Sequence, residues 1–110
     1  MGILVSDYDI MAYLNNKNIS PANRGYEYLR KAIKLATANT DYLHKMVALY
    51  TKVADDSHST SQRVERAIRH NIEISGTKVK NRMFIADAVN YFEMESAKIQ
   101  KENSAFNSRR

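Results

Sequence analysis

The chain is organised around residues 59–75, which read STSQRVERAIRHNIEIS. The first three residues carry hydroxyl groups that can cap a helix. The rest divide between two faces of a helical wheel. One face is mainly apolar and contains Val64, Ala67, Ile68, Asn71, Ile72 and Ser75. The other face is polar and contains Gln62, Arg63, Arg66, Arg69, His70 and Glu73. The pattern predicts an amphipathic helix that buries one face and exposes an arginine-rich one.

The flanking sequence predicts further helices and no strands. The chain has 110 residues, is 44% hydrophobic, and contains only three glycines and one proline. Apolar residues at helical spacing predict helices near residues 6–14, 20–38, 42–53 and 81–99. We therefore expect an all-α bundle of about five to six helices in one domain over residues 1–101, followed by a flexible polar tail over residues 102–110.

Helix-capping residues predict where these helices begin and end. Ser6 can cap the first helix, and Ser20 followed by Pro21 predicts the start of the second. Gly76 is expected to end the central helix in the left-handed conformation. Asn81 is expected to cap the last helix.

Residues 49–75 fit a helix-turn-helix in part. Ala54 is small enough to let two helices cross closely, and Val53 beside it is apolar. The turn fits less well, because His58 stands where glycine is usual and Ser57 stands where an apolar residue would help packing. The pattern alone leaves an ordinary amphipathic helix pair equally open.

The charge distribution is uneven. The net charge is +5, and residues 62–82 contain six basic residues and two acidic ones. Such a segment indicates a surface for a polyanion, with a solvated basic face as the alternative. Arginine can bind the O6 and N7 edge of guanine. Glu65 can accept from the amino group of cytosine, or can simply pair with Arg69 four residues later.

No catalytic or cofactor motif is present. The chain has no cysteine, and His44, His58 and His70 have no metal-type spacing. We therefore expect no enzyme activity, no metal and no cofactor. No apolar run is long enough for a membrane span or a signal peptide, so we expect a cytoplasmic protein with no membrane contact.

Three segments resemble a known family. GYEYLRKAI at residues 25–33, SQRVERAIRH at 61–70 and NRMFIA at 81–86 are similar to segments of the C-terminal DNA-binding domain of the stage-zero sporulation response regulator. The resemblance covers roughly residues 10–96. In the serine-arginine start of the family's recognition helix, Gln62 is inserted or replaces the serine.

The resemblance implies a transcription regulator whose recognition helix, about residues 60–75, lies in the major groove of double-stranded DNA. By match of position, Arg63, Glu65 and Arg66 would contact bases. The residues that we expect at the DNA backbone are Ser61, Gln62, Arg69, His70, Lys78 and Lys80. The resemblance also implies homodimers on tandem sites, and RNA polymerase is a further candidate partner.

Two departures from the family and one rival function remain. We expect the domain to act without a receiver domain, and the link at residues 76–80 is shorter than in the family. The rival function is a helical interaction module that binds a regulator or the transcription machinery through Tyr8, Tyr13 or the last helix, without touching DNA.

Overall fold

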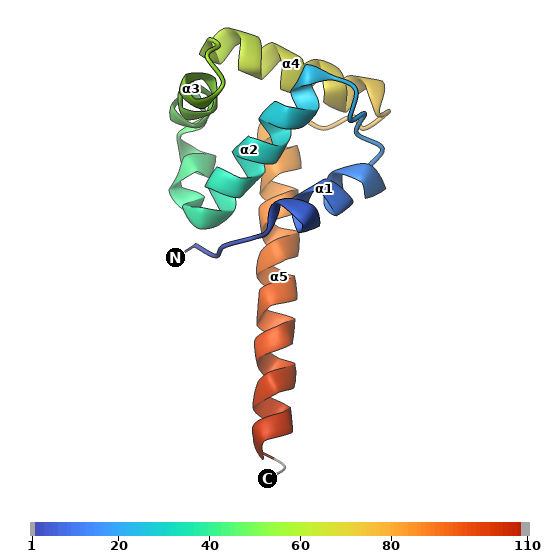
Figure 1. Cartoon of the computed structure of the whole chain (residues 1–110), viewed down its shortest axis with the longest axis vertical. Coiled ribbons are helices and arrows are strands. Elements are labelled where there is room, and N and C mark those ends of the chain that lie inside the picture. The colour runs from blue at the N-terminus through green and yellow to red at the C-terminus, as the bar shows by residue number, and fades with distance from the viewer. Residues whose placement is uncertain (1, 109–110) are drawn as a thin grey trace.

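The computed structural model describes residues 2–108 and, within that range, is entirely helical. Its elements are α1 (Asp7–Asn16), α2 (Arg24–Ala38), the 3-10 helix η1 (Thr40–His44), α3 (Met46–Asp56), α4 (Ser61–Ile74) and α5 (Asn81–Ser108). The shorter helices gather at one end of the molecule, and α5 extends away from them (Figure 1). The predicted all-α bundle is confirmed.

Helix α2 is the centre of the packing, because it contacts α1, η1, α3, α4 and α5. Four of its apolar residues, Leu29, Ala32, Ile33 and Ala36, are completely buried. Every neighbouring helix adds apolar residues to this core. The main ones are Ile10, Leu14, Leu49, Val53, Val64, Ile68, Ile72, Ile85, Ala88 and Val89.

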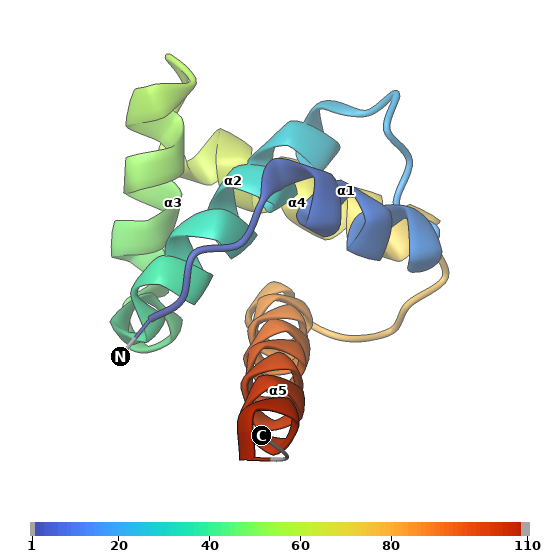
Figure 2. The ribbon, with the colours of Figure 1, turned by 60° about the horizontal axis from the view of Figure 1, so that its bottom comes forward.

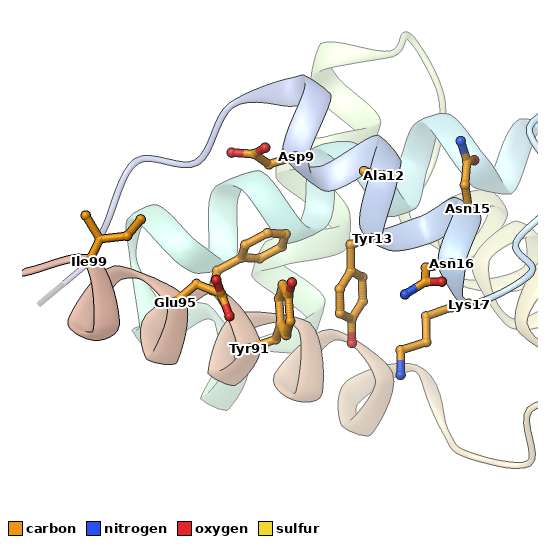
Figure 3. Close-up of a pocket in the computed structure, with 10 residues that line it drawn as sticks. Asp9, Ala12, Tyr13, Asn15, Asn16, Lys17, Tyr91, Glu95 and Ile99 are labelled. Atoms are coloured by element: carbon orange, nitrogen blue, oxygen red, sulfur yellow. The ribbon is translucent and has the colours of Figure 1, made fainter. Parts of the chain in front are cut away.

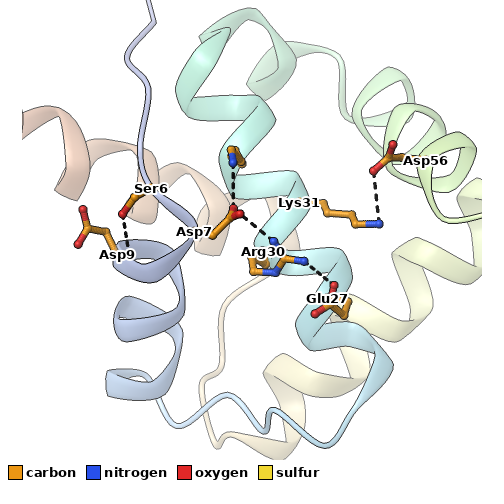
Figure 4. A network of polar contacts seen from close by, with 8 residues as sticks. Ser6, Asp7, Asp9, Glu27, Arg30, Lys31 and Asp56 are labelled. Atoms are coloured by element: carbon orange, nitrogen blue, oxygen red, sulfur yellow. Dashed lines mark hydrogen bonds and ion pairs between the residues drawn. The ribbon is translucent and has the colours of Figure 1, made fainter.

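Charged side chains on the surface join α2 to its neighbours (Figure 4). Asp7 at the start of α1 lies 3.2 Å from Arg30 and 3.0 Å from Lys34. The hydrogen bond from Lys34 lowers the pKa of the Asp7 carboxyl. On the other side of α2, Lys31 lies 3.3 Å from Asp56 of α3. The carboxylates of these pairs are exposed, so each pair adds little stability, and the apolar core supplies most of it.

Three of the predicted helix ends are confirmed. Ser6 accepts a hydrogen bond from the Asp9 amide at 3.1 Å and caps α1. Thr60 accepts one from the Arg63 amide at 3.3 Å and caps α4. After α4, Gly76 has a φ of 86°, the left-handed conformation expected where a helix ends at glycine.

The predicted start of α2 at Ser20 and Pro21 is wrong. The helix begins at Arg24, and the Asn23 side chain caps it by accepting from the Gly25 amide at 3.1 Å. The amide and carbonyl of Ser20 are instead hydrogen-bonded to the side chain of Asn71 in α4. Ser20 is therefore part of a turn that is tied to another helix.

The single helix expected near residues 42–53 is divided. The break expected at residues 39–41 is confined to Asn39, whose side chain accepts from the Asp41 amide at 3.1 Å. The residues that follow form η1, and Lys45, with a φ of −139°, separates η1 from α3. The apolar spacing missed this break, because it continues through both elements.

The last helix differs from the prediction at both ends. Asn81 does not cap it: the Phe84 amide donates to the Lys80 carbonyl, and Asn81 is the first helical residue. Ile99, the last residue of the apolar spacing that predicted this helix near residues 81–99, is 56% exposed. The backbone continues as helix beyond residue 101 to Ser108, through a segment without glycine or proline. The rest of the expected tail, residues 109–110, lies outside the described residues.

Between α3 and α4, the chain makes the turn that the sequence fits least well. Ala54 is 3% exposed, as close crossing of the helices requires. His58 has a φ of 53°, so it adopts the conformation for which glycine is usual at this place. The Ser57 hydroxyl accepts a hydrogen bond from Lys31 at 3.0 Å, which explains a polar residue there.

Replacing His58 with glycine is expected to stabilise the fold. Glycine removes the steric cost of the left-handed conformation, and its greater freedom in the unfolded chain offsets part of the gain. We expect a net gain of about 0.5–1 kcal/mol in urea unfolding. Ser57→Gly is the matched control, because φ at Ser57 is −111° and no strain is relieved there. Equal effects of the two substitutions would contradict this explanation.

Gly25 lets α2 and α4 approach closely. A Cβ atom at this position would lie 2.3 Å from the carbonyl oxygen of Ala67 and 3.0 Å from Cβ of Asn71. Neither atom belongs to the end of a flexible side chain, so the helices would have to separate to admit even a methyl group.

Gly25→Ala is therefore expected to destabilise the protein by about 1–3 kcal/mol in chemical unfolding, as overpacking does. The test is whether the free energy of unfolding falls or rises. Glycine to alanine inside a helix ordinarily stabilises by up to about 1 kcal/mol. A variant more stable than the wild type would show that α2 and α4 do not depend on this contact.

Candidate nucleic-acid interface

Helix α4 lies at the end of the molecule opposite the carboxyl end of α5 (Figure 1). Its buried residues are Val64, Ile68, Asn71 and Ile72. Its exposed residues are Gln62, Arg63, Arg66, Arg69, His70, Glu73 and Ile74. The predicted amphipathic helix is confirmed, and three of the seven exposed side chains are arginines.

Asn71 holds this helix in place from its buried side. Its side chain is completely buried, and its Oδ1 accepts from the Ser20 amide at 3.4 Å. Its Nδ2 donates to the Ser20 carbonyl at 3.3 Å. A polar residue on the apolar face is thereby satisfied, and α4 is fastened to the segment between α1 and α2.

The predicted base-contacting residues do not all occupy the same part of the exposed face. Arg63 and Arg66 are exposed, whereas Glu65 is half-buried on the flank that faces α3 and α5. Glu65 lies 3.4 Å from Arg69 one turn later, so the pairing considered as the alternative for Glu65 is present. That pairing orients both side chains but leaves the Glu65 carboxylate partly exposed.

A hollow beside α4 brings together two of the six predicted backbone-contacting residues, Arg69 and Lys80. Its volume is about 510 Å³. The residues that line it are Tyr50, Glu65, Arg69, Glu73, Val79, Lys80, Asn81 and Arg82. Lys80 is thus brought near Arg69, because residues 75–80 lead from α4 round to the start of α5 (Figure 2). Lys78 lies outside this hollow, in the loop beside Glu73.

The other predicted backbone-contacting residues lie on α4 itself. Ser61 is half-buried at its first position, and its hydroxyl donates to Oε1 of Gln62 at 3.4 Å. Gln62 and His70 are both exposed. The structure therefore gathers the predicted site residues on α4 and on the loop that follows it.

Arg82 is a basic residue at this site that the residue-by-residue prediction missed. It is exposed in the first turn of α5 and lines the same hollow as Lys80. Its Nε donates to the Leu43 carbonyl of η1 at 2.7 Å, which fixes the direction of the guanidinium group. Its place in the basic segment of residues 62–82 was the available signal.

Asn81 joins the start of α5 to both helices of the helix-turn-helix. Its Nδ2 donates to the hydroxyl of Tyr50 in α3 at 3.2 Å and to the Glu65 carbonyl of α4 at 3.1 Å. Burial raises the pKa of Tyr50, and the hydrogen bond from Asn81 opposes that shift. Sequence reasoning took Asn81 for a cap, because capping and tertiary contacts use the same amide group.

A second hollow lies between α1 and α5, away from α4 (Figure 3). It has a volume of about 800 Å³, and its lining includes Asp9, Tyr13, Tyr91 and Glu95. The ring centroids of Tyr13 and Tyr91 are 5.1 Å apart. Lys17 lies 5.5 Å from the centroid of the Tyr13 ring. Tyr8, on the same helix, is 79% exposed.

Neither a metal cluster nor a membrane span is found within residues 2–108. No three or more histidine, aspartate or glutamate side chains of this range lie together as metal ligands would. No helix within it combines the length and apolarity needed to cross a membrane.

Asn81→Leu is expected to destabilise the protein by about 1–3 kcal/mol, because it removes the donor to the buried Tyr50 hydroxyl. In the double variant with Tyr50→Phe, the unpaired hydroxyl is also removed, so the loss should be smaller than the sum of the single losses. Urea unfolding of the four proteins measures this coupling. Strictly additive losses would mean that the two side chains do not interact.

One comparison with known proteins bears on the fold and this site. The sequence pattern of the family described as "Sporulation initiation factor Spo0A C terminal" matches residues 10–109, nearly the whole chain. It extends the resemblance first seen over residues 10–96 to the far end of α5. The family is one of DNA-binding effector domains of transcription regulators, in keeping with the arginine-rich face of α4. The chain belongs to the Spo0A C-terminal family of DNA-binding domains.

Proposed function

We propose that the protein binds specific sequences of double-stranded DNA and regulates transcription by placing α4 in the major groove. The observation that carries this proposal is the exposed face of α4, which presents Arg63, Arg66 and Arg69 on a helix whose other side is firmly buried. A major groove admits an α-helix, and the side chains of that helix reach the base edges.

The roles of the site residues follow from their places. Arg63 and Arg66 are proposed to bind guanine, because a guanidinium group can donate to both O6 and N7. Glu65, held beside Arg69, is proposed to accept from the amino group of cytosine. Ser61, Arg69, His70, Lys78 and Lys80 are proposed to contact the phosphate backbone on either side of the base-reading residues.

Two further partners are proposed from the family resemblance. A second copy of the chain would bind head to tail on an adjacent site, and RNA polymerase would be contacted at the promoter. A cytoplasmic location would give the protein access to bacterial or phage DNA. Gel shifts with one site and with two tandem sites would test the pairing, which requires the second site to be filled more readily than the first.

A protein interaction module is the second candidate function. The aromatic-lined hollow between α1 and α5 and the exposed ring of Tyr8 favour it. A selection from random DNA duplexes separates the two functions. An enriched motif supports sequence-specific DNA binding. A chain that enriches no motif, and whose capture of a bacterial protein is lost on Tyr8→Ala, supports the interaction module.

Arg66→Ala and Lys80→Ala are expected to weaken DNA binding in different ways. Arg66→Ala should relax or abolish the preference for the selected site, with a loss of about 1–3 kcal/mol in discrimination at one base pair. Lys80→Ala should weaken binding to all sequences and lower the slope of log K against log salt by about 0.9, the value for one phosphate contact.

Gel shifts over a series of salt concentrations, with the selected duplex and a scrambled one, measure both effects. Lys98→Ala is the matched control, because Lys98 is exposed on α5 away from α4. If Arg66→Ala and Lys80→Ala both bound the selected site as the wild type does, the proposed interface would be wrong.

A further inference from the structure

We infer that Gln62 reads an adenine in the major groove, and that it is not the backbone contact expected in the sequence analysis. The inference rests on the proposed function of α4. It specifies adenine at one position of the DNA site and assigns the recognition of that base to Gln62.

The place of Gln62 on the helix is the first argument. Gln62 is the second residue of α4, and the residues near the amino end of a recognition helix are those that contact base edges. Gln62 and Arg66 are four residues apart, so their side chains leave successive turns on the same face. Where Arg66 faces a base pair, Gln62 faces a neighbouring one.

The angular position of Gln62 supports the same conclusion. With about 100° of rotation per residue, the exposed residues of α4 span roughly 140°, from Arg69 at one edge to Ile74 at the other. Gln62 lies inside this span, about 20° from Arg69 and about 40° from Arg66, so it is exposed beside a proposed base-reading residue.

The chemistry of the side chain decides which base is read. Oε1 accepts one hydrogen bond, from the Ser61 hydroxyl at 3.4 Å. The structure shows no other hydrogen bond of this side chain within the described residues. The amide therefore retains its N–H groups and a second lone pair on Oε1. That arrangement matches adenine, whose N7 accepts and whose N6 amino group donates.

A contact with a phosphate group would use only the donor of the Gln62 amide and would leave its acceptor without a partner. Phosphate contacts gain most of their affinity by neutralising charge, and the neutral amide supplies none. Four cationic side chains, Arg69, Lys78, Lys80 and Arg82, already lie on the flank of α4 or in the segment that follows it. The amide of Gln62 is more useful where both its donor and its acceptor find partners.

The test begins with a site selected from random duplexes by the full wild-type chain. Binding is then measured with each base in turn at every position of the site, and with 7-deazaadenine, which lacks the N7 acceptor, in place of each adenine. The variants are Gln62→Ala and Gln62→Glu, which is nearly the same size but has no N–H donor. Gln100→Ala, exposed on α5, is the matched control.

We expect the wild type to prefer adenine at one position by roughly 5- to 150-fold, the range for one bidentate pair. Both Gln62 variants should lose that preference and keep the others, and 7-deazaadenine at that position should weaken only proteins with Gln62. The affinities for different bases are compared within each variant, so the general loss of affinity caused by the negative charge of Gln62→Glu cancels. Circular dichroism and thermal unfolding check that the variants remain folded.

Two results would overturn the inference alone. In one, the wild type selects a motif and Gln62→Ala retains every base preference. In the other, Gln62→Ala weakens binding to all sequences equally, which is the behaviour of a backbone contact. If the wild type selects no motif, the proposed function fails and the adenine contact fails with it.

Discussion

The close contact between α2 and α4 is the constraint on which the rest of the structure depends. Gly25 of α2 allows its backbone to approach that of α4 at Ala67. Four residues later in α4, Asn71 is hydrogen-bonded to Ser20 in the segment before α2. Because α2 also contacts the other helices, this contact fixes α4 relative to the whole core. An amphipathic helix can expose a polar face only if its apolar face is held firmly, and here polar and steric contacts act together with apolar burial.

The start of α5 adds a second support from the opposite side. Asn81 connects Tyr50 of α3 with the Glu65 carbonyl of α4, so both helices of the helix-turn-helix are joined to the helix that follows them. Arg82, the next residue, reaches η1. Two adjacent residues thus connect the start of α5 to η1, α3 and α4. This matters because the linking segment at residues 76–80 is short, so a shift of α5 would be transmitted directly to α4.

The sequence predicted the helices that have regular apolar spacing and clear capping residues. Helix α4 and the left-handed Gly76 were predicted closely, because amphipathic spacing and a terminal glycine are local signals. The starts of α2 and α5 were not, because Ser20 and Asn81 use their polar groups in contacts with residues 51 and 16 positions away in the chain. Ile99 was misplaced for another reason: helical spacing shows which residues share a face, but not where the core beneath them ends. For the candidate site, the helical spacing predicted the exposed arginines of α4. The contacts of Arg82 and Asn81 could not be predicted, because they join residues that only the folded chain brings together.

The length of α5 provides a position for a fluorescent label that reports DNA binding. The molecule measures 53 Å along its longest axis but only 26 and 21 Å across, and α5 accounts for this elongation (Figure 1). Lys101 is exposed in the carboxyl-terminal half of that helix, and the carboxyl end of α5 lies at the opposite end of the molecule from α4 (Figure 1). A fluorescent dye attached through cysteine at this position would be the only thiol label, since the chain has no cysteine of its own. It would report the slower rotation of a DNA complex without altering the proposed interface on α4.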